Sequence, residues 1–64
     1  MALSVGQGII DRMAANGDHA IEDSTFTTNG DGTRVERCWG TKGLYLASNA
    51  TGNWEVVGPF GGGA

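Results

Sequence analysis

The clearest indication of the fold is the sequence TFTTNGDGTRVERCW, residues 25–39. At its centre, Asn29-Gly30-Asp31-Gly32 is a strong turn signal, because Asn, Asp and Gly adopt the backbone conformations of tight turns readily. The residues before the turn are rich in Thr and include Phe26, which favours a strand over residues 20–28. After the turn, Val35, Arg37 and Trp39 alternate with Arg34, Glu36 and Cys38, and a period of two is typical of a strand. We therefore expect a β-hairpin formed by residues 20–28 and 33–39.

The same pattern continues towards the C-terminus. Residues 40–43 (Gly-Thr-Lys-Gly) predict a second turn, and residues 44–48 and 54–57 predict two further strands joined by the polar segment 49–53. Strands spaced about ten residues apart with short polar turns are typical of an antiparallel meander. Pro59 is expected to end the last strand, and residues 61–64 (Gly-Gly-Gly-Ala) are expected to form a flexible tail.

Residues 4–16 predict a helix upstream of the hairpin. Ser4 and Gln7 have the spacing of a capping box, and Asn16-Gly17 is a natural left-handed stop. At 100° per residue one arc of the helix holds the apolar side chains of Val5, Ile9, Ile10 and Met13. An extended start over residues 2–8 is the alternative, because Leu3 and Val5 alternate. The predicted fold class is α+β: one N-terminal helix packed on a small antiparallel four-stranded β-meander, in a single domain over residues 1–60.

Strand 33–39 carries charge on both of its faces. Such a strand lies at the edge of a sheet or against something polar. The pattern points to an interface.

The chain is too small to build a large core. Its 64 residues include 12 glycines. Burial of apolar surface contributes about 85 kcal/mol at about 25 cal/mol per Å². Ordering the chain costs about 90 kcal/mol. Because the two terms cancel, we expect a marginal monomer that gains stability in a homo-oligomer or on a larger assembly.

Candidate catalytic and metal-binding residues are few. Asp18, His19, Glu22 and Asp23 form the one local cluster of metal-capable groups, but zinc sites draw on several His or Cys residues and the chain has one of each. If a metal binds, His19 and Asp23 are the expected ligands. The segment from Asn29 to Thr33 has only part of a calcium-loop pattern, so a plain turn is the better interpretation. Cys38 and His19 lack a recognisable catalytic setting, so we predict neither an enzyme nor a cofactor, and Cys38 as a buried or half-buried small side chain.

Charge bears on the class of partner. The net charge is −3 and the pI is about 4.6, which is the wrong sign for binding nucleic acid. Residues 1–32 carry a net −4 and residues 33–64 a net +1. Identical subunits could therefore pair an acidic segment with Arg34, Arg37 and Lys42 of a neighbour. No apolar run has the length of a membrane span, and the first residues lack a secretory signal pattern, so we expect a cytoplasmic or virion location.

The aromatic residues suggest where a partner binds. Trp54 and Phe60 flank the last strand, and Trp is enriched at interface hot spots. The predicted interface residues are Arg34, Arg37, Trp39, Trp54 and Phe60. Alternatively, Tyr45 and Trp54 could form a stacking platform for a carbohydrate or peptide.

In composition, the Gly-, Thr- and Asn-rich strands and the scarcity of lysine resemble small phage virion proteins such as head-decoration or tail-associated modules. The resemblance carries no diagnostic motif and assigns no site. The sequence thus favours a non-enzymatic structural or interaction protein, in a homo-oligomer or docked on a larger assembly such as a virion. The alternatives are a small carbohydrate- or peptide-binding module and an acidic inhibitor of a basic protein.

Overall fold

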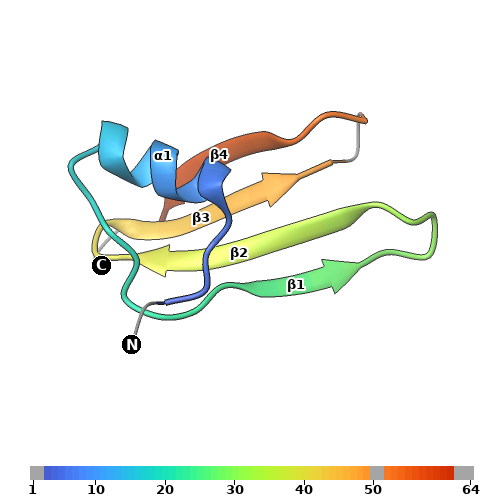
Figure 1. Cartoon of the computed structure of the whole chain (residues 1–64), viewed down its shortest axis with the longest axis horizontal. Coiled ribbons are helices and arrows are strands. Elements are labelled where there is room, and N and C mark those ends of the chain that lie inside the picture. Colours follow the sequence, from blue (N-terminus) through green and yellow to red (C-terminus); the bar gives the residue numbers. More distant parts are fainter. Residues whose placement is uncertain (1–2, 50–51, 62–64) are drawn as a thin grey trace.

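The computed structural model describes residues 3–49 and 52–61 and contains one helix and one sheet. Helix α1 (Gln7–Ala15) is followed by strands β1 (Thr25–Thr28), β2 (Arg34–Gly40), β3 (Gly43–Ser48) and β4 (Glu55–Phe60). The strands form an antiparallel sheet in the order β1-β2-β3-β4, and α1 lies across one face of it (Figure 1). The predicted α+β fold, a helix on a four-stranded meander, is confirmed.

Helix α1 begins later than the sequence predicts, and the predicted capping box is wrong. Gly6 is the N-cap residue, and as a glycine it makes no side-chain capping hydrogen bond of its own. Ser4 instead joins the loop before β1, because its N–H donates to Asp23 and its carbonyl oxygen accepts from the N–H and the hydroxyl of Ser24. The predicted stop is confirmed, since Gly17 follows the helix with a φ of +68°, a conformation that costs glycine little.

The first strand is shorter than predicted, with β1 confined to Thr25–Thr28. Ala20, the expected start of the strand, makes only an isolated bridge to Gly40. Between them the chain is a loop in which the Ile21 N–H donates to the carbonyl of Trp39 and the Ser24 N–H to that of Ser4. These contacts hold the loop against the end of β2 and leave four residues for the strand.

The last strand is longer than predicted, and the prediction that Pro59 ends it is wrong. Strand β4 runs to Phe60 with a register shift opposite Tyr45, and it lies at the edge of the sheet. An edge strand tolerates proline because the missing N–H can be one that no neighbouring strand needs. Gly58 permits the shift. Its φ is +127°, and a Cβ atom there would lie 2.8 Å from the carbonyl oxygen of Leu44. Residues 62–64 of the expected tail lie outside the described residues.

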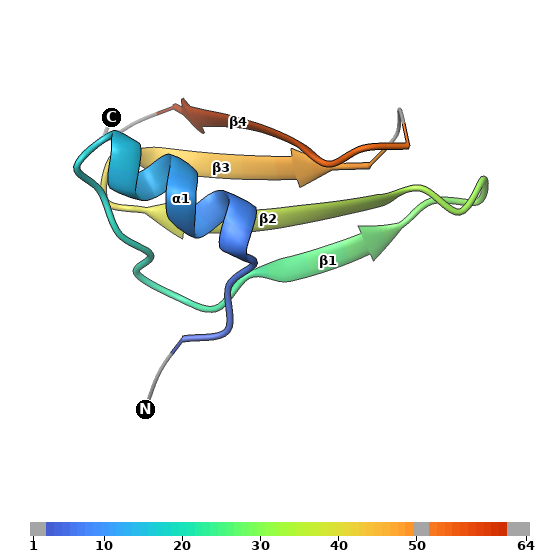
Figure 2. The same cartoon turned by 45° about the horizontal axis from the view of Figure 1, so that its top comes forward.

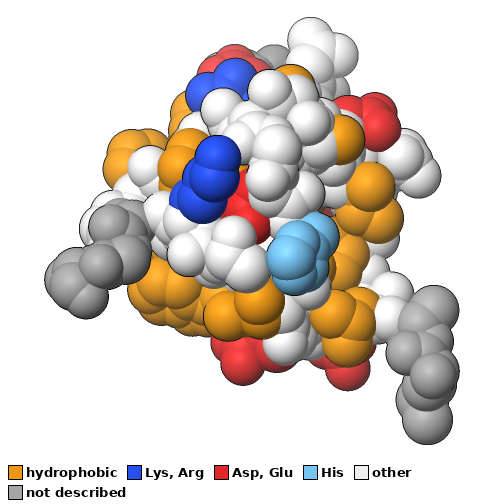
Figure 3. Space-filling view, turned by 90° about the vertical axis from the view of Figure 1, so that its left-hand side faces the viewer, with side chains coloured by type: hydrophobic (Ala, Val, Ile, Leu, Met, Phe, Trp, Pro, Cys, Tyr) orange, Lys and Arg blue, Asp and Glu red, His pale blue; other side chains and the backbone are white. Residues whose placement is uncertain are grey.

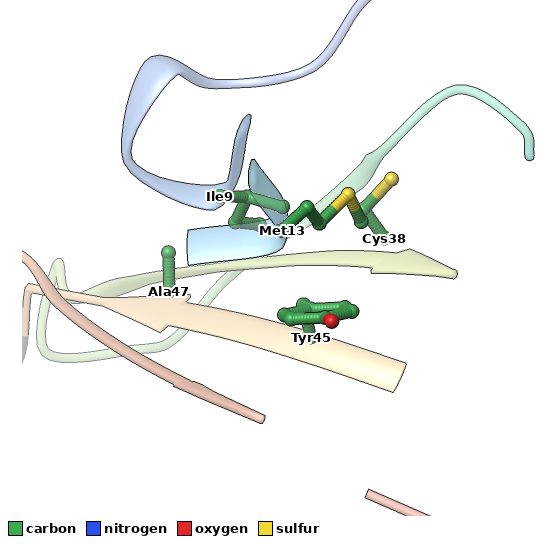
Figure 4. Close-up of a cluster of buried hydrophobic side chains, with 5 residues drawn as sticks. All are labelled: Ile9, Met13, Cys38, Tyr45 and Ala47. Carbon is green, nitrogen blue, oxygen red and sulfur yellow. The ribbon is translucent and has the colours of Figure 1, made fainter. Parts of the chain in front are cut away.

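The core lies between α1 and the sheet. Its buried side chains come from the helix, from β2 and from β3: Ile9, Met13, Cys38, Tyr45 and Ala47 (Figure 4). Val5, Ala20 and Val56 pack against this cluster. Ile10, which the helical arc also assigned to the core, is 41% exposed. The predicted burial of Cys38 is confirmed, with 1% of the residue exposed.

Strand β2 lies inside the sheet, between β1 and β3. Its two charged faces therefore do not mark an edge, which corrects one of the two alternatives for strand 33–39. The other alternative, contact with polar groups, is what the structure has. Glu36 accepts a hydrogen bond from the N–H of Gly6, and Arg37 donates to the hydroxyl of Thr27.

Helix α1, with nine residues, is too short to cross a membrane, and among the described residues no other helix could do so.

Candidate functional site

The sheet has one covered face and one open face. Figures 1 and 2 show α1 on one side of the sheet, and among the described residues no helix or strand covers the other side. Glu36 and Cys38 are buried, with Cys38 packed against the core side chains of α1, so the alternating residues of β2 point away from the helix. We call this opposite side the open face.

The strand register extends the open face across the sheet. Arg37 pairs with Leu46, which pairs with Val57, and Trp39 pairs with Leu44. The apolar residues of the open face are Val35, Trp39, Leu44, Leu46, Val57 and Phe60. Leu44 and Leu46 are half-buried, whereas Trp39 is 45%, Val57 43% and Phe60 50% exposed. Apolar side chains therefore lie together on three neighbouring strands, on the side of the sheet that faces away from the helix.

Few charges interrupt the open face. Arg37 lies near its centre, and its guanidinium donates to the Thr27 hydroxyl at 2.7 Å. Glu55 lies at its edge, in register with Ser48. The face thus carries one positive and one negative group.

A groove lies on the covered side, where α1 leaves the sheet free. It has a volume of about 320 Å³, and its lining includes Phe26 of β1, Trp54 before β4, Val56 and Ala47. Phe26 and Trp54 are 49% and 51% exposed. The Arg34 guanidinium lies 4.7 Å from the centroid of the Phe26 ring, which is close enough for a cation–π contact.

Glu36 lines this groove and also holds the start of the helix. It is 4% exposed, and its Oε2 accepts the N–H of Gly6 at 2.7 Å. A carboxylate at the N-terminus of a helix is favourable because the peptide dipoles place partial positive charge there. A Cβ atom at Gly6 would collide with this carboxylate, so a larger residue at the helix N-cap would require the Glu36 side chain to shift.

Asp18 anchors the opposite end of the helix to the β2–β3 turn. Its carboxylate accepts hydrogen bonds from the backbone N–H groups of His19, Thr41 and Lys42. The hydroxyls of Thr41 and Tyr45 also donate to it. Burial alone would raise the pKa of this carboxyl, but the hydrogen bonds, led by that of the Thr41 side chain, outweigh burial and hold the pKa well below its usual range.

The metal-capable residues of segment 18–23, for which no metal was predicted, do not come together as a ligand set. Asp18 turns inward to the β2–β3 turn, Asp23 accepts the N–H of Ser4, and His19 lies on the surface at that end of the molecule (Figure 3). Within residues 3–49 and 52–61, no three His, Cys, Asp or Glu side chains come together.

The Asn29–Thr33 segment is a plain turn. The Asn29 N–H donates to the Thr33 carbonyl, and the Thr33 hydroxyl donates to Asp31. The prediction that this segment forms a turn is therefore confirmed.

Cys38 has the properties of a structural thiol. Its thiol donates to the carbonyl of Glu22 at 3.3 Å. Burial and then the nearby carboxylates of Glu36, Glu22 and Asp23 raise its pKa. A raised pKa lowers the fraction of reactive thiolate at neutral pH.

Comparisons with known proteins do not assign the chain to a family. No family model, curated protein or solved structure matches the chain.

The five predicted interface residues fall into two sets on opposite sides of the sheet. Arg37, Trp39 and Phe60 belong to the open face. Arg34 and Trp54 line the groove on the covered side.

Sequence reasoning missed residues on both sides. On the open face, Leu44 and Leu46 alternate with Tyr45, and this strand, apolar on both faces, could have placed the two leucines on the side of the sheet opposite the helix. On the covered side, Phe26 was not assigned to a surface. Tyr45 is 0% exposed and has no surface to offer to a platform with Trp54.

Proposed function

We propose that this chain is a non-enzymatic structural or interaction protein whose open face is covered by another protein surface in its working state. The observation that carries the proposal is the apolar patch of the open face, which includes Trp39, Val57 and Phe60 at 43–50% exposure. Aromatic side chains buried at the centre of an interface supply much of its binding energy.

The size of the core supports the same proposal. The buried cluster contains five side chains, and a core of this size in a 64-residue chain stabilises the fold weakly. A protein surface laid against the open face would turn a sheet buried on one side into a sheet buried on both. The partner is a second copy of the chain or a larger assembly, and the composition favours a virion component.

The test is the state of the isolated chain in solution. At micromolar concentration we expect it to sediment above its chain mass of 6.6 kDa, or to show weak, readily denatured structure when alone. A well-folded monomer with a high melting temperature that does not change with concentration would contradict the proposal.

A second candidate function is a small peptide- or carbohydrate-binding module, and the groove favours it. Phe26 and Trp54 line the groove at about half exposure, and aromatic faces of this kind stack on sugar rings and apolar side chains. The test is the fluorescence of Trp54 in a Trp39→Phe variant, titrated with a panel of glycans and short peptides. A saturable spectral shift that Phe26→Ser abolishes supports this function, and no shift with any ligand excludes it.

A further inference from the structure

We propose that the open face binds the open face of a second copy of this chain, so that two sheets stack face to face with the two helices outside. This inference rests on the proposed function and names its partner. Each copy would contribute the same patch to a two-fold symmetric interface, which is the commonest arrangement in homodimers.

The dimensions of the molecule fit this arrangement. The two longer extents of the chain are 32 Å and 25 Å, so a broad face covers at most about 800 Å². A stable interface of standard size buries about 800 Å² on each partner. Because these extents include the loops and the helix, a homodimer of standard size would have to use nearly all of this side of the molecule.

The chemistry of the face also fits a second sheet. Its apolar residues stand on three adjacent strands: Val35, Trp39, Leu44, Leu46, Val57 and Phe60. Two sheets that pack face to face interdigitate such side chains at a separation of about 10 Å.

The charges do not oppose self-association at this face. Arg37 and Glu55 together contribute no net charge, so the chain's net charge of −3 resides entirely elsewhere. The other acidic residues belong to α1, to loops or to the covered side of the sheet. Two copies brought together by their open faces therefore meet through surfaces with no net charge, which reduces the repulsion expected between two acidic proteins.

The other routes to a dimer are weaker. Edge-to-edge pairing through β1 has only four residues to use, and pairing through β4 meets Pro59, which cannot donate a hydrogen bond. The groove on the covered side contains the nearly buried Glu36 carboxylate, which an apolar partner would desolvate at a cost.

The chain contains two matched pairs of residues for the experiment. Trp39 on the open face and Trp54 in the groove are 45% and 51% exposed, and Phe60 on the open face and Phe26 in the groove are 50% and 49% exposed. We would measure the dimer dissociation constant of the full chain by sedimentation equilibrium, with far-UV circular dichroism to verify folding. Trp39→Ser and Phe60→Ser are expected to raise the constant by at least about tenfold. Their matched controls, Trp54→Ser and Phe26→Ser, should change it by less than about threefold.

Fluorescence gives a second measurement that does not depend on a disruptive variant. In Trp54→Phe, Trp39 is the remaining tryptophan, and its emission should shift to the blue and become less quenched by acrylamide as protein concentration rises. In Trp39→Phe, the emission of Trp54 should not change with concentration.

The outcomes separate this inference from the proposed function. A stable, folded wild-type monomer overturns both. A weakly folded monomer overturns the homodimer but supports docking on another protein. If Trp54→Ser or Phe26→Ser weakens the dimer and the open-face substitutions do not, the assignment of the interface to the open face is wrong. The chain would still form a homo-oligomer, but through the side that carries the groove.

Discussion

The two faces of the sheet are built from alternate residues of the same strands, yet within residues 3–49 and 52–61 a helix covers only one of them. On the covered face, the helix buries Tyr45 and Cys38, and the carboxylates of Asp18 and Glu36 have hydrogen-bond donors. On the open face, aromatic and aliphatic side chains of similar size are left half exposed. The covered face thus holds the core that stabilises the fold, whereas the open face is the surface proposed to bind a partner.

The largest effect expected on stability tests the covered face. Ile9 is 0% exposed in the core, and Ile9→Ala should lower the free energy of unfolding by about 2–5 kcal/mol, enough to unfold a chain of this size. Val57→Ala, on the open face at 43% exposure, should cost less than about 1 kcal/mol when the chain is monomeric. Urea denaturation at low protein concentration checks both values. Equal losses would mean that the two faces contribute alike to folding.

The second-largest loss of stability is expected at low pH and involves Asp18. Because hydrogen bonds hold the pKa of Asp18 in the folded chain below its usual range, its contribution to stability is fully present above the unfolded pKa of about 3.9 and is lost as the pH falls below it. We expect the melting temperature of the wild type to fall steadily from about pH 5 downwards. Asp18→Asn should be less stable at neutral pH and should show a flatter acid response. A parallel pH profile in the two proteins would show that the Asp18 carboxylate does not anchor the covered face.

The β4 bulge is the place where the backbone, rather than a side chain, limits substitution. Gly58→Ala would place a Cβ atom 2.8 Å from the Leu44 carbonyl oxygen and 3.0 Å from the Tyr45 Cα atom, at a φ of +127°. We expect a loss of about 1–3 kcal/mol in thermal or urea unfolding. Gly30→Ala is the control, since a Cβ atom there has nothing within 4 Å. If both variants lose the same stability, close packing of β4 against β3 is not needed.

The sequence predicts the order of the elements well because the signals involved are local. Turn residues such as Asn29-Gly30 and the alternation in β2 depend on neighbouring residues, and the meander follows from their spacing. The predicted start of the helix was wrong because the N–H of its N-cap residue donates to Glu36, which lies 30 residues away in the sequence. The prediction that Pro59 ends β4 was wrong for a related reason, since the continuation of the strand depends on its lying at an edge of the sheet.

The candidate site was predicted in part, for the same physical reason. Arg37 and Trp39 share a face by their spacing alone, and Arg34 must lie on the opposite face. Which of those faces the helix covers depends on tertiary packing. The groove between Phe26 and Trp54 depends on the register of all four strands, because the two residues belong to opposite edges of the sheet.

The smallest effect tests whether a polar contact on the open face matters to the fold. Thr27→Val removes the acceptor of the Arg37 guanidinium, and since both groups remain accessible to water, the monomer should lose less than about 1 kcal/mol in urea unfolding. Thr25→Val is the matched control, because Thr25 lies in register with Arg37, whereas the guanidinium donates to Thr27. If Thr27→Val instead destabilises the chain as much as Ile9→Ala, the hydrogen bond on the open face supports the fold directly. The distinction between a covered face that stabilises the fold and an open face that is proposed to bind a partner would then be wrong.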